Sequence, residues 1–466
     1  MQPVLTVSEM RAVDARAQAS TPLEVLVGRA GHAVAVAALD MLGGAYGRRV
    51  VAVCGRGNNG ADGRVAAQVL AQRGARLRVV EAGTEARVGP ADLVIDAAYG
   101  TGFRGEYRSP EVDPGTPVLA VDIPSGVEGD TGQASGAPLA ATRTVTFAAL
   151  KPGLVQGEGA VLAGEVFVAD IGLPPGDSAV WAMEDGDVAL LPPRGRDGNK
   201  WSAAVLVVAG SPGMTGAAAL CARSAYRTGA GMVRLGVPGG RIAEAPASEA
   251  VSVPLPAGGW SGPALEAASR CAAVVVGPGL GRQPSSAAEV RRLVLESPVP
   301  VVVDADGLFA LGSAAGPLNA RSTVVLTPHD GEYVRLMDDR PGPDRIDAAR
   351  RLAVAWGAVA LLKGPTTAVA EPGGRVLLGL SGTSRLATAG TGDVLSGMIG
   401  AMVSRGVGPL GAAALAAHVH GRAGARGPVE GLVAGDLPDR VSEVLSDLRS
   451  SGGSTRGRTC HRSRRG

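Results

Sequence analysis

Arg49-Val-Val-Ala-Val-Cys54, followed directly by Gly-Arg-Gly-Asn-Asn-Gly-Ala-Asp-Gly63, indicates how the chain folds. The valine-rich part predicts a buried β-strand, and the glycines predict a tight turn at the carboxyl end of that strand. A helical pattern follows at residues 64–73. Strand, glycine loop and helix in this order form the repeating unit of an α/β fold with parallel strands.

The same alternation extends over most of the chain. Residues 8–42 have helical spacing, with Ser8 as the expected N-cap. We therefore expect the fold class to be α/β, with two doubly wound domains and a Rossmann-like sheet in the N-terminal one. Further strands are predicted at 77–80, 93–96, 118–121, 144–147 and 165–168, then at 204–209, 232–237, 273–277, 301–304, 323–327 and 359–363.

The length of 466 residues is too great for one core and predicts at least two domains. A segment rich in Pro, Gly, Asp and Arg at 176–199 is the expected linker between domains at 1–175 and 200–448. The last residues, 449–466, are basic and rich in Ser and Gly, so we expect a disordered tail there.

Charge and hydropathy exclude several classes of protein. The formal net charge of +2 comes from 45 basic and 43 acidic residues that are interspersed, so no footprint for nucleic acid is expected. The N-terminus has no pattern of an export or transit signal. The apolar stretch at 394–418 is interrupted by Arg405 and Pro409, which favours a buried helix pair over a membrane span. We expect a cytoplasmic protein that binds no membrane.

Cysteine and lysine are both sparse. Cys54, Cys221, Cys271 and Cys460 have no paired or ligand-like spacing and are interpreted as buried thiols in a reducing compartment. The lysines are only Lys151, Lys200 and Lys363, whereas arginine supplies the other positive charges. A lysine kept where arginine is the rule calls for an explanation, because the two side chains are not interchangeable.

The first glycine loop has two interpretations. Gly55, Gly57 and Gly60 form G-x-G-x-x-G after a strand, and Glu81 lies about twenty residues on, as in dinucleotide-binding dehydrogenases. However, the loop also contains Asn58, Asn59 and Asp62, which a loop built only to approach pyrophosphate does not need. We therefore favour a loop whose side chains bind a ligand or an ion.

Polar residues also follow the next two strands of this half. Asp96 precedes Ala-Ala-Tyr-Gly-Thr-Gly-Phe-Arg-Gly105, and Asp122 precedes Ile-Pro-Ser125-Gly126. The carboxyl ends of neighbouring parallel strands share one crevice, so Asn59, Asp96 and Ser125 are expected to converge there with Asp122. Their oxygens suit a weakly held monovalent cation better than zinc. The alternative is that both aspartates only cap helices or fix turns.

The second half repeats this arrangement. Glycine loops at 210–218 and 277–281 follow strands and allow close approach of a ligand, although each could be a simple turn. His329, in Thr-Pro-His-Asp-Gly-Glu332, stands at a strand end where α/β enzymes bind ligands. Lys363, in Lys-Gly-Pro-Thr-Thr367, combines an ammonium, backbone N–H groups and hydroxyls, which suit a nucleotide phosphate.

The segment Leu386-Ala-Thr-Ala-Gly-Thr-Gly-Asp393-Val-Leu-Ser-Gly397 places a carboxylate beside free N–H groups at a helix start. This combination suits a phosphoryl group meeting a hydroxyl that must lose its proton, with Asp393 as the base. Ribokinase-like enzymes share the arrangement, so we expect a ribokinase-like sheet in the C-terminal domain.

The motifs of the first half together resemble the NAD(P)H-hydrate epimerase domain over about residues 5–175. They are Asn-Asn-Gly-x-Asp-Gly, Asp-Ala-x-x-Gly-Thr-Gly, Val-Asp-Ile-Pro-Ser-Gly and Thr144-Val-Thr-Phe-Ala-Ala-Leu-Lys-Pro-Gly153. Many members of that family have Gly where this chain has Ala61. The resemblance implies that potassium is held by Asn59, Asp96 and Ser125 and that Asp122 contacts the substrate. Our own hypothesis is that Asp122 is catalytic, as the acid/base that assists inversion at the hydrated ring carbon. The resemblance also implies that the hydrated nucleotide is held by Asn58, Asn59, Gly60, Ala61, Asp62, Gly100, Thr101, Gly102, Phe103, Arg104, Gly105, Glu106 and Asp122.

The motifs of the second half resemble the ADP- or ATP-dependent NAD(P)H-hydrate dehydratase over about residues 195–445. They include Met214-Thr-Gly-Ala-Ala, Asp304-Ala-Asp306, Thr-Pro-His-x-Gly-Glu and Lys-Gly-x-x-Thr. Where members of that family often have His-Lys, this chain has Asn199-Lys200. The resemblance implies that Ala217, Gly279, His329 and Asp393 border the hydrated nucleotide. It also implies that the adenine nucleotide is held by Lys363, Gly364, Pro365, Thr366, Thr367 and Gly392.

The two resemblances describe consecutive repairs of hydrated NADH and NADPH. The first unit would interconvert the R and S hydrates, and the second would dehydrate the S form with ADP or ATP, expected with Mg²⁺. We also expect a homo-oligomer whose partners are these small molecules. The alternative is a ribokinase-like kinase for a small metabolite, fused to a non-catalytic nucleotide-binding module.

Overall fold

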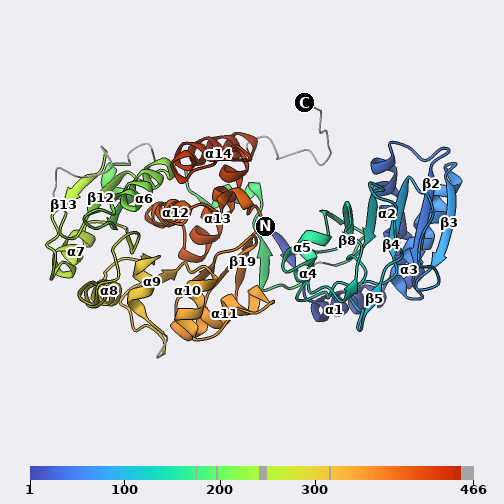
Figure 1. Cartoon of the computed structure of the whole chain (residues 1–466), viewed down its shortest axis with the longest axis horizontal. Coiled ribbons are helices and arrows are strands. Elements are labelled where there is room, and N and C mark those ends of the chain that lie inside the picture. The colour runs from blue at the N-terminus through green and yellow to red at the C-terminus, as the bar shows by residue number, and fades with distance from the viewer. Residues whose placement is uncertain (175, 196–197, 241–248, 314–315, 453–466) are drawn as a thin grey trace. The chain divides into compact units, whose positions relative to one another are not determined.

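The computed structural model describes residues 1–174, 176–195, 198–240, 249–313 and 316–452. The chain divides into two compact units, Gln2–Val180 and Trp181 onward, each with its own sheet (Figure 1). The expected linker at 176–199 contains regular structure, namely β10 (Val180–Ala182) and the 3₁₀ helix η1 (Asp185–Leu190). A second 3₁₀ helix, η2 (Lys200–Ala203), begins directly after it. Residues 449–452 of the expected tail belong to a helix, and Cys460 lies outside the described residues.

The N-terminal sheet has six parallel strands in the order β3-β2-β4-β6-β8-β9. The chain passes from β2 to β3 on one side and then returns to β4 on the other side of β2. The point between β2 and β4 is therefore the topological switch point, where a crevice opens at the carboxyl ends of the strands. The strands are β2 (Arg49–Cys54), β3 (Arg76–Glu81), β4 (Leu93–Ala97), β6 (Val118–Val121), β8 (Arg143–Phe147) and β9 (Glu165–Ala169). Three short strands lie outside this sheet. They are β1 (Gln2–Val4) and the pair β5 (Tyr107–Arg108) and β7 (Gly136–Ala137), which forms a separate two-stranded sheet.

The two helical stretches expected in this unit, 8–42 and 64–73, differ in their bounds from the helices that form. The stretch 8–42 is broken into α1 (Val7–Gln18) and α2 (Leu23–Leu42), with Thr6 rather than Ser8 as the N-cap of α1. Thr6 and Glu9 form a reciprocal capping box, and Pro22 interrupts the helical pattern. Helix α3 (Asn58–Gln72) begins inside the expected glycine loop, so Asn58, Asn59 and Asp62 lie on its first turns. Two short helices, α4 (Pro152–Val155) and α5 (Gly159–Leu162), complete the unit.

The two faces of the N-terminal sheet are covered differently. Helices α2 and α3 pack on one face, over alternate strand residues such as Ala52, Ile95 and Leu119. The other face, which includes Val53, packs against loop residues such as Phe103 and against Tyr107 of β5. Helix α2 has the length and composition of a membrane span, but it also contributes buried residues to this core, as the core helix of a globular domain does.

The C-terminal sheet runs in the order β10-β19-β18-β17-β16-β15-β14-β11-β12-β13. Its central strands are parallel, as expected, whereas β18 pairs antiparallel with β17 and β19. Its switch point lies between β11 and β14, because the chain proceeds from β11 to β12 and then crosses back. The strands are β11 (Ala204–Val208), β12 (Met232–Gly236), β13 (Val251–Val253), β14 (Ala273–Val276), β15 (Val301–Val303), β16 (Val324–Leu326), β17 (Val359–Leu362), β18 (Thr367–Ala370) and β19 (Val376–Gly379).

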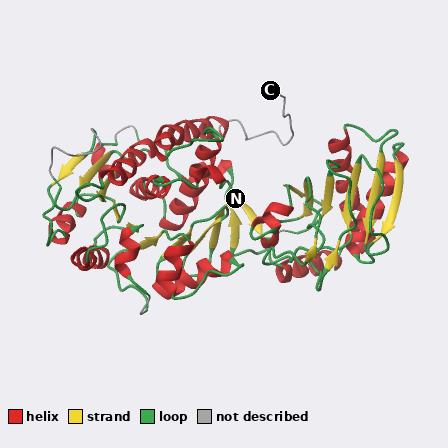
Figure 2. Ribbon diagram, in the orientation of Figure 1, coloured by secondary structure: helices red, strands yellow, loops and turns green. Residues whose placement is uncertain are grey.

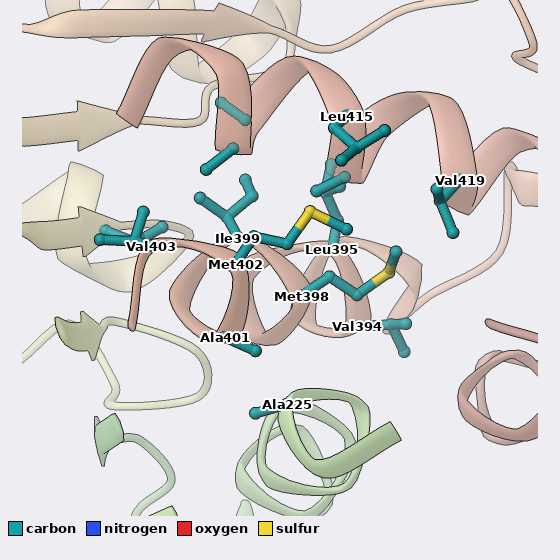
Figure 3. Packing of buried hydrophobic residues seen from close by; sticks show 14 of the residues in the cluster. Ala225, Val394, Leu395, Met398, Ile399, Ala401, Met402, Val403, Leu415 and Val419 are labelled. Carbon is teal, nitrogen blue, oxygen red and sulfur yellow. The ribbon is translucent and has the colours of Figure 1, made fainter. Parts of the chain in front are cut away.

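Helix α12 (Thr391–Ser404) is the central helix of this unit. Between Val394 and Ser404 every residue is buried, because α12 lies between the sheet, α6 (Thr215–Thr228) and α13 (Pro409–Ala425) (Figure 3). The expected buried helix pair at 394–418 is therefore confirmed. The remaining helices, visible in red in Figure 2, are α7 (Ser261–Ala268), α8 (Pro284–Glu296), α9 (Asp306–Leu311), α10 (Asp330–Met337), α11 (Arg345–Trp356) and α14 (Leu437–Gly452), with short 3₁₀ helices η4 (Ser384–Leu386) and η5 (Ala434–Asp436).

Candidate active sites

A cavity of about 450 Å³ opens at the switch point of the N-terminal sheet. The loops after β2 and β4 form one side of it, and α1 and α2 form another. Glu81 pairs with Arg64 and does not line the cavity, which weakens the dehydrogenase interpretation. The predicted residues that line the cavity are Asn58, Asn59, Asp62, Gly100, Thr101, Gly102, Phe103 and Asp122. Those that do not are Gly60, Ala61, Arg104, Gly105 and Glu106.

Asp122 is held in the cavity by a strained backbone and by several donors. Its φ of 69° is left-handed, which costs a non-glycine residue about 1–3 kcal/mol and is typical of functional sites. Oδ1 lies 2.8 Å from Nζ of Lys151 and accepts a hydrogen bond from Oγ1 of Thr146 at 3.1 Å. Burial alone would raise the pKa of Asp122, but the Lys151 ammonium and the hydrogen bonds together lower it. Asp122 is therefore ionised at neutral pH.

Lys151 is a residue of this site that the sequence reasoning did not assign. Its side chain is only 2% exposed, and Nζ donates to Oγ1 of Thr146 at 2.6 Å and to the carbonyl of Phe147 at 2.9 Å. A buried ammonium is costly unless it is paired and hydrogen-bonded, and here both conditions are met. The scarcity of lysine was the signal that could have identified it.

Asp96 and Ser125 are in direct contact at the ends of their strands. The Ser125 hydroxyl donates to Oδ1 of Asp96 at 2.6 Å, and its backbone N–H donates to Oδ2 at 2.9 Å. Asn59 donates through Nδ2 to the carbonyl of Val121 at 2.6 Å, which leaves its buried Oδ1 without a hydrogen-bond partner. Burial raises the pKa of Asp96 in spite of its hydrogen bonds. A buried carboxylate and an orphaned amide oxygen fit the donor set of a monovalent cation.

Asp62 and Asp14 also face this cavity. The pKa of Asp62 is raised to about 8, first by burial and then by the charges of Asp122 and Asp14. Burial likewise raises the pKa of Asp14, although Lys151 opposes the shift. The cavity therefore combines an ionised carboxylate, Asp122, with a carboxyl group that keeps its proton at neutral pH, Asp62.

Gly60→Ala is expected to destabilise the N-terminal unit. A Cβ at this position would lie 1.9 Å from the carbonyl oxygen of Gly55, so the first turn of α3 would have to move away from the loop after β2. Such overpacking costs about 1–3 kcal/mol, seen as a lower unfolding midpoint in denaturant. Gly57→Ala is the matched control, because no atom lies within 4 Å of its added Cβ. Equal stabilities of the two variants would contradict this packing.

The two glycine loops of the C-terminal unit meet at its switch point. The N–H of Gly210 donates to the carbonyl of Pro278 at 2.7 Å, so the loop after β11 rests on the loop after β14. Ala217 and Gly279 face each other there, since a Cβ on Gly279 would lie 3.0 Å from that of Ala217. The structure thus brings together these two predicted substrate-binding positions.

A charged cluster lies next to these loops. Asp304, which is 1% exposed, accepts hydrogen bonds from Nζ of Lys363 at 2.7 Å and from the hydroxyl of Ser396. Glu332 lies 3.9 Å from the same Nζ. Burial would lower the pKa of Lys363, but Asp304 and Glu332 raise it, so the lysine stays charged. Ala305, next to Asp304, has a φ of 50° and is a second strained non-glycine residue at a strand end.

Asp393 lies on the first turn of α12, after a left-handed Gly390. The first N–H groups of a helix have no partner within it, so this end can bind an anion. A Cβ on Gly392 would lie 3.3 Å from Nζ of Lys363, which puts the ammonium beside these N–H groups. The pKa of Asp393 is raised to about 7, first by burial and then by Asp304, while Lys363 opposes the shift.

A second cavity, of about 550 Å³, extends from this cluster and is mostly lined by small and aliphatic residues. Of the predicted nucleotide-binding residues it includes Lys363, Gly364, Pro365, Thr367 and Gly392, but not Thr366. Buried His420 also lines it and was not identified from the sequence. Burial, together with Lys363, lowers the pKa of His420 to about 4, so its ring is neutral.

His329 has a structural role that the sequence reasoning did not foresee. It is the N-cap of α10, and its Nδ1 accepts hydrogen bonds from the N–H groups of Gly331 and Glu332. The N–H of His329 in turn donates to a carboxylate oxygen of Glu332, which completes a capping box. His329 nevertheless lines the second cavity, which is compatible with the predicted contact to a ligand.

Known proteins match both units. Residues 205–447 match the family model described as NAD(P)H-hydrate dehydratase, and residues 23–153 match that of the YjeF-related protein N-terminus in two overlapping segments. The bifunctional NAD(P)H-hydrate repair enzyme of Salinibacter ruber is 36% identical, with 97% of each chain covered. That of Mycobacterium leprae is 38% identical, with 97% of this chain and 99% of the relative covered. The chain belongs to the bifunctional NAD(P)H-hydrate repair enzyme family.

A solved structure supports the fold of the second unit of this repair-enzyme chain. A ribokinase-like superfamily protein from Enterococcus faecalis has 19% sequence identity and a TM-score of 0.50, with 59% of this chain and 97% of that chain covered. The expectation of a ribokinase-like C-terminal domain is thereby confirmed. The roles of the individual site residues, and the domain bounds expected from the sequence, stay predictions.

Proposed function

We propose that this chain repairs hydrated NADH and NADPH in two steps. The N-terminal unit interconverts the R and S hydrates, and the C-terminal unit dehydrates the S form at the expense of ADP or ATP, giving AMP or ADP and phosphate. The observation that carries the proposal is a cleft at the carboxyl ends of strands in each of the two units, in one chain that is matched over 97% of its length by a relative named for repair of NAD(P)H hydrates.

In the C-terminal unit the chemistry begins with Asp393. Its carboxylate takes the proton of the ring hydroxyl, and the hydroxyl oxygen attacks the terminal phosphoryl group of the nucleotide. The N–H groups at the start of α12 and the ammonium of Lys363 stabilise the charge on the transferring group. The C–O bond to the resulting phosphate then breaks, and loss of a ring proton yields NADH or NADPH. Phosphate is a far better leaving group than hydroxide.

The residues around this site fit a phosphate rather than a bare metal ion. Among the described residues there is no group of three or more His, Cys, Asp or Glu side chains placed to hold a metal. Asp304 is engaged by Lys363, and Asp306 by Arg282. Mg²⁺ therefore belongs to the proposal as an ion that arrives with the nucleotide phosphates and neutralises part of their charge.

In the N-terminal unit the proposal assigns the hydrated nicotinamide to the cavity that Asp122 faces. Asn59, Asp96 and Ser125 would hold K⁺, whose charge would compensate the buried carboxylate of Asp96 and fix the loop after β4. Lys151 keeps Asp122 ionised and oriented toward the cavity. Asp122 can then accept a proton from the substrate hydroxyl.

The proposal also covers the location of the enzyme in the cell and its partners. The three described cysteines are free and buried, as is usual in a reducing compartment, which supports a cytoplasmic location. The expected partners are the small-molecule substrates, with neither nucleic acid nor membrane, and a homo-oligomeric state stays a prediction.

The test is incubation of the purified chain with chemically prepared R/S NADHX and ADP or ATP. We expect complete recovery of NADH absorbance at 340 nm, with one phosphate released for each NADH. If only half of the hydrate is converted faster than it converts spontaneously, the chain has the dehydratase activity but lacks the epimerase activity. A phosphorylated product that accumulates without NADH would instead support the small-metabolite kinase.

A further inference from the structure

The N-terminal cavity contains more acid–base groups than one proton transfer needs. Asp62 is 7% exposed, and its carboxyl group is part of the cavity wall. In the described part of the chain it has no hydrogen-bond or ion-pair partner. Asp122, which lines the same cavity, has an ammonium, a hydroxyl and a backbone N–H directed at it. The two carboxyl groups thus share one cavity but have opposite surroundings.

These surroundings set opposite protonation states. Burial without a donor favours the neutral form of Asp62, and three donors favour the charged form of Asp122. A neutral carboxyl group can donate a proton, and a charged one can accept it. A pair of carboxyl groups whose environments drive their proton affinities apart marks the acid and the base of a reaction.

We propose that Asp62 is the general acid of the epimerase and works together with Asp122 as the general base. This inference rests on the proposed function of the N-terminal unit. It goes beyond substrate binding by the Asn-Asn-Gly-x-Asp-Gly motif, because it gives Asp62 a chemical step of its own.

The step balances with these two groups alone. Asp122 takes the proton of the hydroxyl on the hydrated ring carbon, and a C=O bond forms as the bond from this carbon to the ring nitrogen breaks. The electron pair of that bond stays on the nitrogen, which receives the proton of Asp62. Rotation turns the other face of the aldehyde to the nitrogen, and closure runs the same transfers in reverse. Asp122 ends ionised and Asp62 protonated, as at the start, and neither water nor a redox partner is consumed.

The charges around Asp62 support this assignment. Helix α1 brings a further carboxyl group, whose charge adds to that of Asp122 in disfavouring ionisation of Asp62. The only described ammonium on the cavity wall is Lys151, which is bound to Asp122. The titratable and charged groups that line the cavity with Asp62 are Arg11 and Asp14 from α1, Tyr99 after β4, Asp122 after β6 and Lys151 before α4.

The test compares Asp62→Asn with the wild-type chain in a direct assay of R/S equilibration. Pure S hydrate is incubated without nucleotide, and the appearance of the R hydrate is followed by chromatography with the spontaneous rate subtracted. We expect the turnover rate of Asp62→Asn to fall about 10²- to 10⁴-fold, with KM changed only a few-fold. An Asp62→Asn rate within threefold of wild type would overturn the proposal.

The pH dependence of the wild-type rate tests the same point without a substitution. Because Asp62 acts in its protonated form, the rate should fall about tenfold per pH unit above about 8. Asp62→Asn should lose this alkaline decline, which a merely structural role would not produce. A wild-type rate that stays constant from pH 7 to 10 would overturn the assignment of Asp62. Wild-type chain that dehydrates the S hydrate but shows no equilibration at all would instead overturn the epimerase function itself.

Discussion

Asp393→Asn should lower the rate of NADH formation from the S hydrate by about 10²- to 10⁴-fold. The substitution keeps the size of the side chain but removes the only group on the first turn of α12 that can accept the hydroxyl proton. Binding of the nucleotide should change little, because Lys363 and the N–H groups of the helix start remain. The measurement is the initial rate of absorbance increase at 340 nm with S-NADHX and saturating ADP or ATP.

The pH profile provides a second test of Asp393. Because the base must be ionised, the wild-type rate should fall as the pH drops through about 7, the pKa to which burial and Asp304 raise this group. Asp447→Asn is the matched control, since Asp447 lies on the surface of α14 in an ion pair with Arg426. Full activity of Asp393→Asn, or a wild-type rate that is flat from pH 5 to 8, would exclude Asp393 as the base.

Asp122→Asn is expected to abolish epimerisation and to leave dehydration of the S hydrate unchanged. The loss should again be about 10²- to 10⁴-fold, because the amide cannot take the hydroxyl proton. It also leaves the buried Lys151 without its carboxylate, so the N-terminal unit should lose about 3–5 kcal/mol of stability, as when one partner of a buried pair is removed. Equilibration of the hydrates and unfolding in urea measure the two effects separately.

The matched control for Asp122 is Asp40→Asn. Asp40 lies on α2 and pairs at the surface with Arg143, with a side chain that is 71% exposed, so its loss should cost at most about 1 kcal/mol. If Asp122→Asn equilibrates the hydrates at the wild-type rate, the assignment of the base in the N-terminal cavity is wrong.

The sequence was sufficient for those parts of the fold that repeat a simple pattern. Valine-rich runs between glycine loops gave the parallel strands, and the residues at their carboxyl ends marked the two clefts. Helix boundaries were less predictable, because they depend on local hydrogen bonds. Thr6 caps α1 through a reciprocal bond with Glu9, and Asn59 lies on the first turn of α3 rather than in a loop. The antiparallel direction of β18 could not be predicted, because it depends on pairing with β17 and β19 that no repeating pattern in the sequence indicates.

The charged groups that shift the pKa values of the site residues were the least predictable, because they lie far from those residues in the sequence. Lys151 reaches Asp122 across 29 residues of sequence, and Lys363 reaches Asp304 across 59. Neither pairing leaves a local pattern, although the scarcity of lysine pointed to both lysines. His420 is buried in a helix and could not be distinguished from a structural histidine. Only the folded chain shows that Asp62 has no partner among the residues that the structure describes.

The most direct measurement of the whole account uses the pure R hydrate of NADH with ADP or ATP. NADH can form from it only if the chain first converts R to S and then dehydrates S, so one absorbance trace reports both units. We predict complete conversion to NADH at a rate well above spontaneous epimerisation. A mixture of Asp122→Asn and Asp393→Asn chains, each of which lacks one of the two activities, should also convert the R hydrate to NADH. No NADH from the R hydrate, with the S hydrate still converted, would contradict the central claim that one chain performs both repairs.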